Sequence, residues 1–202
     1  MIYSFYDLHY DLQKEGFIMS GQIKANPSLR SVDKVRWITV TALFMALNIA
    51  MSSFGIPVPG GHLYLCDVVI CTAALLLDPF AAFLVGGVGS FLGDFLFYPA
   101  PMFVSLVTHG IQAMVISLFA GKGRKFGGKK NFVFSLIGTL VGAVIMVVGY
   151  TLGKTYVYAT FEYAMIKLPF EIAQALLGVI GSLLLVFRLG LAKALRRFGP
   201  YR

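Results

Sequence analysis

The stretch TALFMALNIAMSSFG, residues 41–55, has no charged side chain and is typical of a membrane-spanning helix. Within it, Ala42, Ala46 and Ala50 recur at every fourth residue. A helical step of about 100° places these alanines on one slowly drifting line. Leucine would match lipid tails at least as well, whereas small side chains let another helix approach closely. The stripe therefore predicts a helix surface that packs against protein.

The composition of the whole chain is that of a polytopic membrane protein. Of its 202 residues, 58% are hydrophobic and only 13% are charged, and the mean hydropathy is +0.80. A soluble domain of this length needs far more polar surface. Because a bilayer core of about 30 Å takes roughly 20 helical residues, we predict an all-α fold, a compact bundle of six transmembrane helices, at residues 36–55, 65–77, 80–97, 102–120, 132–152 and 168–188.

Prolines mark the breaks between the predicted helices. The segment GIPVPGGH (55–62) cannot be continuous helix, because its two prolines lack the backbone donor. Asp78 and Pro79 predict a tight turn in which the proline opens the next helix. YPAP (98–101) is another break, and we place Pro169 in the first turn of the sixth helix.

Small residues inside the helices predict close packing. Gly89 and Gly93 are four residues apart, as are Gly138 and Gly142. Such pairs allow two helix backbones to approach each other. The glycine pattern therefore supports a tightly packed bundle.

The lysines and arginines predict the orientation. With the N-terminus in the cytoplasm, fifteen of them lie inside, in the N-terminal segment, in GKGRKFGGKK (121–130) and after residue 187. Only Lys154 and Lys167 then lie outside. This asymmetry follows the positive-inside rule, so both termini are predicted to be cytoplasmic, in a prokaryotic plasma membrane. The net charge of +8 is then topogenic, and we expect contact with the lipid bilayer but no nucleic-acid partner.

We divide the chain into a polar tail (1–35), a six-helix transmembrane domain (36–190) and a basic cytoplasmic tail (191–202). The residues KEG before FIM can be encoded by a purine-rich ribosome-binding sequence upstream of Met19. We therefore hypothesise that Met19 is the true start and that residues 1–18 are a mis-assigned start. The alternative is a genuine polar tail.

Four ionisable residues fall at a common depth in the outer half of the predicted bundle. A charge at the bilayer centre costs about 2.5–3.5 kcal/mol on insertion scales, so these side chains are expected to face a cavity or each other. We predict one polar substrate-binding cavity that opens outward, lined by Asp67, Asp94, His109 and Glu171 together with Asn48, Gln112 and Gln174.

Structural roles for the ionisable residues remain open alternatives. Asp67 and Glu171 fall near predicted helix N-termini, where carboxylates act as caps. Asp94 is either interfacial or paired with His109, and His109 is otherwise a buried, satisfied histidine. Glu171 and Gln174, three residues apart, share one helix face and are suited to hold a ligand together.

Aromatic residues gather in the predicted outer loops. One interpretation is the interfacial aromatic belt of membrane proteins. The other is a set of walls for a flat heterocycle, since ligand sites combine apolar walls with a few polar groups. We assign to the second interpretation Tyr64, Tyr98, Tyr156, Tyr163 and Phe170.

No motif in the chain indicates an enzyme. GYTLGKT (149–155) resembles a phosphate-binding loop, but it is one residue too short and follows a membrane helix instead of a strand. The three histidines are scattered, and Cys66 and Cys71 are expected to be buried hydrophobes instead of a disulfide or metal site. We expect no cofactor, no metal and no catalytic residue, so any nucleotide-driven step requires another protein.

The order of these motifs resembles the substrate-binding S components of energy-coupling factor (ECF) vitamin transporters, over residues 36–190. The resemblance rests on ALFMALNIA (42–50), on the loop, short helix, proline turn and glycine-rich helix of residues 60–96, on THGIQAMVISLFAGK (108–122) and on LPFEIAQALLGVIGSLLL (168–185).

This resemblance implies a function and partners. An S component binds one vitamin from outside, in a pocket formed mainly by its last three helices and closed by outer loops. It docks through its first helix onto a membrane T component, and two cytoplasmic ATPases drive reorientation. Ala42 and Ala46 match the docking motif, with Ala50 continuing it. Residues 56–64 match the gating loop, and the pocket helices carry His109, Gln112, Glu171 and Gln174.

Within the family the chain is most similar to the hydroxymethylpyrimidine or pyridoxine type. Pantothenate would require a cation, for which only Lys154 and Lys167 are near, and riboflavin would require a larger aromatic slot. The alternatives are an S component for one of those vitamins, or a stand-alone small membrane channel or structural membrane protein. In the latter case the alanine stripe packs within its own bundle, against the second or the sixth helix.

Overall fold

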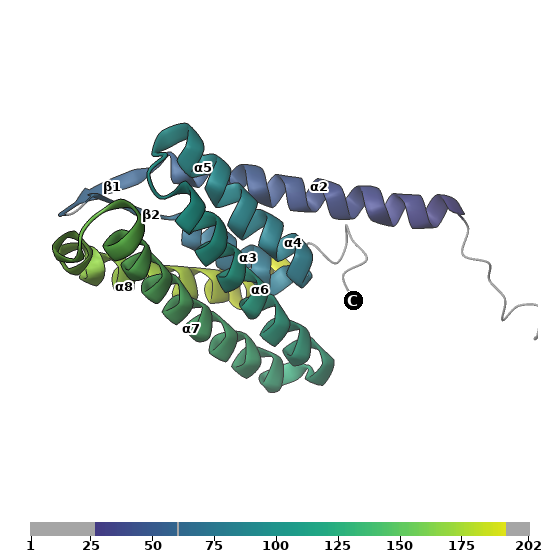
Figure 1. Cartoon of the computed structure of the whole chain (residues 1–202). Helices are drawn as coiled ribbons and strands as arrows, with labels where there is room; N and C mark the ends of the chain where they lie inside the picture. Colours follow the sequence, from purple (N-terminus) through teal and green to yellow (C-terminus); the bar gives the residue numbers. More distant parts are fainter. Residues whose placement is uncertain (1–26, 60, 193–202) are drawn as a thin grey trace, which may run out of the picture. The chain divides into compact units, whose positions relative to one another are not determined.

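The computed structural model describes residues 27–59 and 61–192. The hypothesis about Met19 lies outside these residues. The chain divides between Arg36 and Trp37 into two units, and the buried core lies in the second. The elements (Figure 1) are α2 (Pro27–Ser52), β1 (Gly55–Val58), β2 (Gly61–Tyr64), α3 (Cys66–Leu76), α4 (Pro79–Phe83), η1 (Leu84–Val88), α5 (Gly89–Phe97), α6 (Met102–Phe126), α7 (Gly128–Gly153), η2 (Lys154–Tyr158), α8 (Phe161–Leu183) and η3 (Leu184–Arg188).

The helices confirm the predicted all-α membrane fold. Five helical segments of the described chain are long and apolar enough to cross a membrane, and the shorter apolar helix Cys66–Leu76 is the sixth. Each of η1, η2 and η3 is a π-helical turn that continues an α-helix. Such wide turns are frequent at functional sites.

The turn between α3 and α4 forms as the sequence predicts. Asp78 is the N-cap of α4, and its side chain accepts hydrogen bonds from the backbone N–H groups of Phe80 and Ala81, each at 3.1 Å. The second carboxylate oxygen accepts the Trp37 indole N–H at 2.5 Å. Trp37 also stacks on Phe80, with ring centroids 6.1 Å apart. Asp78 thus fixes both the turn and the adjacent end of α2.

Several helix boundaries differ from the prediction. The predicted basic loop at residues 121–130 is almost entirely helical, because Gly127, with φ 67°, joins α6 to α7 in a single turn. The sixth helix begins at Phe161, where Thr160 accepts the backbone N–H of Tyr163 at 3.3 Å. Pro169 therefore lies inside α8 and not in its first turn, so that prediction is wrong.

The segment that cannot be helical forms a hairpin instead of an irregular loop. β1 and β2 pair antiparallel, with Gly55 opposite Tyr64 and Val58 opposite Gly61. Gly61 has φ +126°, and an added Cβ would lie 3.2 Å from the Lys167 Nζ. The hairpin therefore lies close to α8, and its tip leaves little room for a side chain.

Glycines bring α6 into close contact with two neighbouring helices. A Cβ on Gly86 would lie 2.6 Å from the His109 backbone oxygen, and one on Gly142 would lie 2.6 Å from the Ile116 side chain. Cβ atoms are not found at such distances from other heavy atoms, so only glycine fits. The predicted close helix packing is confirmed here, and it holds α6 between η1 and α7.

The two faces of α2 have opposite surroundings. Its buried side chains form the inner stripe Thr41, Phe44, Asn48 and Ser52, whereas Ala42, Ala46 and Ala50 are exposed. The alternative that the alanines pack within their own bundle is therefore wrong. The inner stripe instead carries the contacts, and the alanine stripe remains an uncovered surface of the described chain.

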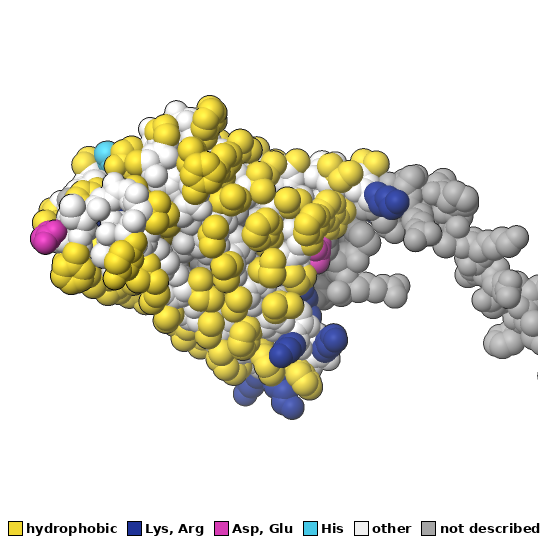
Figure 2. Space-filling model, in the orientation of Figure 1, with side chains coloured by type: hydrophobic (Ala, Val, Ile, Leu, Met, Phe, Trp, Pro, Cys, Tyr) yellow, Lys and Arg dark blue, Asp and Glu magenta, His cyan; other side chains and the backbone are white. Residues whose placement is uncertain are grey.

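The surface has the character expected for a bilayer. Figure 2 shows hydrophobic side chains over most of the visible face, with lysines and arginines gathered where α6 meets α7. The sequence at this junction, residues 121–130, contains Lys122, Arg124, Lys125, Lys129 and Lys130. The charged end and the apolar sides are the pattern that the positive-inside rule predicts.

Candidate substrate-binding site

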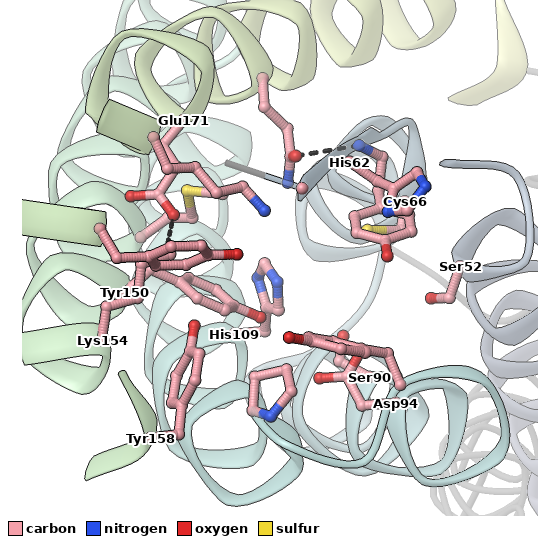
Figure 3. Close-up of a pocket in the computed structure, with 18 residues that line it drawn as sticks. Ser52, His62, Cys66, Ser90, Asp94, His109, Tyr150, Lys154, Tyr158 and Glu171 are labelled. Atoms are coloured by element: carbon pink, nitrogen blue, oxygen red, sulfur yellow. Dashed lines mark hydrogen bonds and ion pairs between the residues drawn. The ribbon is translucent and has the colours of Figure 1, made fainter. Parts of the chain in front are cut away.

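A cavity of about 200 Å³ lies among the hairpin and the helices α2, α3, α5, α6, α7 and α8. Figure 3 shows Glu171, Lys154 and Tyr150 on one wall, Cys66 and His62 on the opposite side, and His109 between them. All of the long bundle elements thus contribute to one space. The cavity is lined by both charged and aromatic side chains, as the sequence led us to expect.

Seven of the twelve residues predicted as substrate-binding line this cavity: Tyr64, Asp94, Tyr98, His109, Tyr163, Glu171 and Gln174. The remaining five do not line it: Asn48, Asp67, Gln112, Tyr156 and Phe170. Contact with a substrate stays a prediction for the first group. For Asn48, Asp67, Gln112 and Tyr156 the structure gives other surroundings.

A buried ion pair forms the wall between η2 and α8. The Lys154 ammonium donates to the Glu171 Oε1, and the side chains are only 2% and 3% exposed. The Lys154 Nζ also lies 5.0 Å from the centroid of the Tyr150 ring. Glu171 Oε2 is buried and has no hydrogen-bond partner within residues 27–59 and 61–192. Because a buried carboxylate oxygen without a donor is unfavourable, this atom is available to a ligand donor.

Glu171 does not act as a helix cap. It lies ten residues inside α8, because that helix begins at Phe161. Asp67 does lie in the first turn of α3, yet that helix has no side-chain cap hydrogen bond. The capping alternative is therefore wrong for Glu171, which pairs with Lys154. Asp67 keeps the first-turn position in which a carboxylate favours a helix N-terminus, and its oxygens also accept the Gln112 and Gln174 amides.

Asp94 ends a chain of hydroxyl groups. Ser105 Oγ donates to Asp94 Oδ2, and the Tyr150 hydroxyl lies 2.5 Å from the same Ser105 oxygen. A serine has a single hydroxyl proton, so the Tyr150 hydroxyl donates to Ser105. The Tyr150 ring in turn packs against His109, with centroids 5.2 Å apart. These hydrogen bonds orient the Tyr150 ring, which forms one aromatic wall of the cavity.

A second polar network lies behind His109, with Asp67 at its centre. Gln112 Nε2 and Gln174 Nε2 donate to the two Asp67 carboxylate oxygens, at 3.2 and 2.5 Å. Gln112 Oε1 lies 2.7 Å from His109 Nδ1, and Gln174 Oε1 accepts the Tyr64 backbone N–H at 3.0 Å. Burial raises the pKa of the Tyr64 hydroxyl, so this group stays a neutral donor at the cavity.

The residues outside the cavity have definite positions. Asn48 is fully buried and donates to the Val85 carbonyl at 2.8 Å and to Ser90 Oγ at 3.2 Å. Ser90 itself lines the cavity. Tyr156 is 80% exposed, because the η2 turn directs Lys154 and Tyr158 to the cavity and leaves Tyr156 on the outer side. This exposure is compatible with the aromatic-belt interpretation.

Cys66, Asp67 and His109 are close enough to be considered as a metal site. Their potential ligand atoms all lie within 4.8 Å of one another, and all three residues are buried. However, both Asp67 oxygens already accept amide N–H groups. A cation there would have to displace those two donors. The arrangement therefore fits a hydrogen-bonded carboxylate better than a metal ligand.

Sequence reasoning missed several cavity residues, of which the most informative is Lys154. The sequence places it outside the membrane and offers it only as one of two cations near enough for a pantothenate carboxylate. One signal was present: Lys154 directly follows the uncharged membrane segment 131–153. Charges in such surroundings are expected to pair. The other missed lining residues include His62, Cys66, Tyr150, Tyr158 and Lys167.

Fold and cavity together define a class, the membrane-embedded subunits that bind small polar molecules within a helix bundle. Residues 32–193 match the family described as ECF-type riboflavin transporter, S component, and the chain belongs to this family. It is thus a multi-pass membrane protein and the substrate-specific subunit of an ECF transporter, a transport family and not an enzyme family. Family membership implies a small-molecule substrate, a T component and ATPases, and it excludes the stand-alone channel or structural protein.

One relative of this chain comes from Pyrococcus woesei. It is 31% identical over 137 residues, which span 67% of this chain and 88% of the relative. That protein is described only as an uncharacterized protein in a gap 3′ region. That description names no substrate, so the similarity to this relative gives no information about what is bound.

Proposed function

We propose that this S component binds a flat, single-ring vitamin or vitamin precursor of the hydroxymethylpyrimidine or pyridoxine type. The cavity volume is the observation that carries this proposal. Ligand pockets commonly measure about 300–1,000 Å³, whereas this cavity measures about 200 Å³. A single substituted ring suits that space better than a fused three-ring system with a long side chain.

The polar groups of the cavity are compatible with such a ring. Glu171 Oε2 is a buried acceptor without a donor in the described chain, and it suits an amino or hydroxymethyl substituent. Tyr158 and Tyr163 line the same space, and their hydroxyls are donors suited to ring nitrogens. Tyrosine rings also supply flat apolar surface for a heterocycle.

Riboflavin is the second candidate, because the family that matches this chain carries riboflavin in its description. Tyr98, Tyr150, Tyr158 and Tyr163 give the cavity the aromatic character that a flavin ring requires. To hold a flavin, the cavity would have to widen, and the strand β2 (Gly61–Tyr64) is a non-helical part of its boundary. Volume thus favours the first candidate, and family description favours the second.

Ligand titration separates these candidates. We expect calorimetry on the purified full-length protein to detect binding of hydroxymethylpyrimidine or pyridoxine, and Glu171→Gln to weaken it at least tenfold. Glu162→Gln is the matched control, because Glu162 is exposed in the first turn of the same helix. Binding of riboflavin alone would select the second candidate. Failure of all tested vitamins, pantothenate included, would refute the heterocyclic-vitamin proposal.

We further propose that the T component docks on the exposed stripe Ala42, Ala46 and Ala50. The stripe lies opposite the inner face of α2, which is occupied by the protein's own contacts. Small side chains allow close approach of a second helix in the membrane, where packing drives association. Asn48 and Ser52 on the inner face reach Ser90 and the cavity, so one helix borders both the substrate and the proposed partner surface.

Added bulk on the stripe tests the docking proposal. We expect Ala46→Leu to abolish vitamin uptake in cells while thermal stability and ligand binding remain unchanged. Ala100→Leu is the control, since it adds the same bulk at an exposed position in the break between α5 and α6. Normal uptake by Ala42→Leu and Ala46→Leu would show that the partner docks elsewhere.

A further inference from the structure

Asp67 is a buried carboxylate that the cavity lining does not include, although it lies at the centre of the polar network behind it. It is 1% exposed, and its two oxygens bind two glutamine side chains from different helices, Gln112 of α6 and Gln174 of α8. The network therefore joins α3, α6, α8 and, through the Tyr64 N–H, the strand β2. No sequence motif marks this arrangement.

The chemistry of Asp67 fixes the orientation of both amides. An ionised carboxylate accepts hydrogen bonds and donates none. Each glutamine must therefore turn its NH₂ group toward Asp67 and its carbonyl oxygen away. Gln174 Oε1 then meets the Tyr64 backbone N–H at 3.0 Å, which can only donate. The Gln174 contacts are thus consistent with this orientation at both ends.

The orientation of Gln112 also determines which ring nitrogen of His109 carries the proton. Gln112 Oε1 lies 2.7 Å from His109 Nδ1, and a carbonyl oxygen can only accept. Nδ1 must therefore carry a proton. In a neutral imidazole the second nitrogen, Nε2, is then a bare acceptor. The described part of the chain shows no hydrogen bond to Nε2, while the His109 ring lines the cavity (Figure 3).

We propose that Asp67 is a positioning residue for substrate specificity. Acting through Gln112, it holds His109 in the Nδ1–H tautomer, so the cavity presents Nε2 as an acceptor to a ligand that donates a ring N–H, an amino group or a hydroxyl. Acting through Gln174, it holds β2 beside the same cavity. This role rests on the proposed function only in that the ligand contacts His109.

The structure distinguishes this role from an ordinary buried ion pair. Asp67 Oδ1 lies 3.8 Å from His109 Nδ1, too far for a direct hydrogen bond. Gln112 lies between them in the hydrogen-bonded chain, and it transmits orientation without transferring charge. An amide between a carboxylate and an imidazole has one permitted orientation, whereas a direct pair would also favour a charged ring.

Asp67→Asn tests the proposal, because asparagine has the same shape but one donor and one acceptor. It can satisfy only one glutamine in the present orientation. The other amide must rotate or lose its partner. We expect the variant to populate the Nε2–H tautomer of His109 and to bind hydroxymethylpyrimidine about tenfold to a hundredfold more weakly. Asp78→Asn is the control, since Asp78 caps a helix outside the cavity.

The tautomer is read directly by nitrogen NMR of histidine-labelled protein, with His9→Gln and His62→Gln in the background so that only His109 contributes. A predominant Nδ1–H tautomer in the Asp67 protein, absent or reduced in Asp67→Asn and retained in Asp78→Asn, would support the proposal. An Nε2–H tautomer in the Asp67 protein would overturn it even if Asp67→Asn fails to fold. An unchanged tautomer in Asp67→Asn would overturn it as well.

The two parts of the experiment separate this inference from the proposed function. The NMR measurement needs no ligand, so it decides the role of Asp67 alone. If the tautomer follows the prediction but neither hydroxymethylpyrimidine nor riboflavin binds, the proposed substrates are wrong and the positioning role stands. If the vitamin binds equally well to both proteins, the specificity role is refuted.

Discussion

Replacing Glu171 by glutamine should destabilise the protein strongly, because it leaves the Lys154 ammonium buried without a counter-charge. The two side chains are 2% and 3% exposed and form an ion pair. Removing one partner of a buried pair costs about 3–5 kcal/mol, whereas replacing both by apolar residues is often neutral. For a chain of this length, 1 kcal/mol shifts the melting temperature by roughly 2–4 °C. We therefore expect Glu171→Gln to lower it by about 6–20 °C.

The double variant Lys154→Met/Glu171→Leu makes this prediction specific to the pair. We expect it to recover most of the loss in stability, although not substrate binding. A thiol-reactive dye is a suitable probe of thermal unfolding in detergent, because Cys66 and Cys71 are both free and buried. Glu162→Gln should leave the transition nearly unchanged. If the loss of stability in the double variant equals the sum of the losses in the single variants, the attraction between the two charges does not offset the free-energy cost of burying them. That result would refute the reasoning.

Three further predictions follow from close contacts elsewhere. Gly61→Ala should speed ligand release, measured by stopped-flow with a bound vitamin, because φ is +126° and the added Cβ would lie 3.2 Å from the nearest side-chain atom; an unchanged rate would show that the hairpin does not border the exit. Gly142→Ala should cost about 1–3 kcal/mol of thermal stability by overpacking against Ile116, and Ile116→Val should restore part of it. Trp37→Phe should cost about 1.5–3 kcal/mol by removing the hydrogen bond to the Asp78 carboxylate, and an unaltered melting curve would contradict this.

The sequence was sufficient for the fold because hydropathy and turn chemistry are local signals. The Asp78–Pro79 turn follows from two adjacent residues, and the structure shows both capping hydrogen bonds. The predicted start of the sixth helix next to Pro169 is wrong because it, too, rests on a local signal. Proline is common in a first helical turn, but in membrane helices it is also tolerated in the interior, where neighbours satisfy the freed backbone groups. Only the packing of α8 decides between these two positions.

The candidate site was predictable in composition but not in geometry. Polar residues at a shared depth indicated a cavity, and His109, Glu171 and Asp94 line it. Which of two polar neighbours faces the cavity depends on helix rotation, which no local pattern specifies. Gln112 and His109 are three residues apart on one helix, yet His109 lines the cavity and Gln112 lies behind it. Lys154 was missed because its partner Glu171 lies 17 residues away, beyond the reach of helical spacing rules.

The π-helical turn η1 accommodates one extra residue within the helical segment Pro79–Phe97. It contains Gly86 and Gly87, which face the backbone of α6, and it precedes Ser90 and Asp94 of α5, which line the cavity. Asn48 donates to the Val85 carbonyl within this wide turn. Deleting one residue there would return the turn to ordinary α-helical spacing, because a π-turn holds one residue more than an α-turn, and would leave Ser90 and Asp94 facing the cavity. A one-residue deletion between Ser90 and Asp94, in the regular helix α5, would instead rotate Asp94 by about 100°. One residue can thus be lost at η1 without exchanging the side chains that line the cavity, whereas one lost from α5 exchanges them.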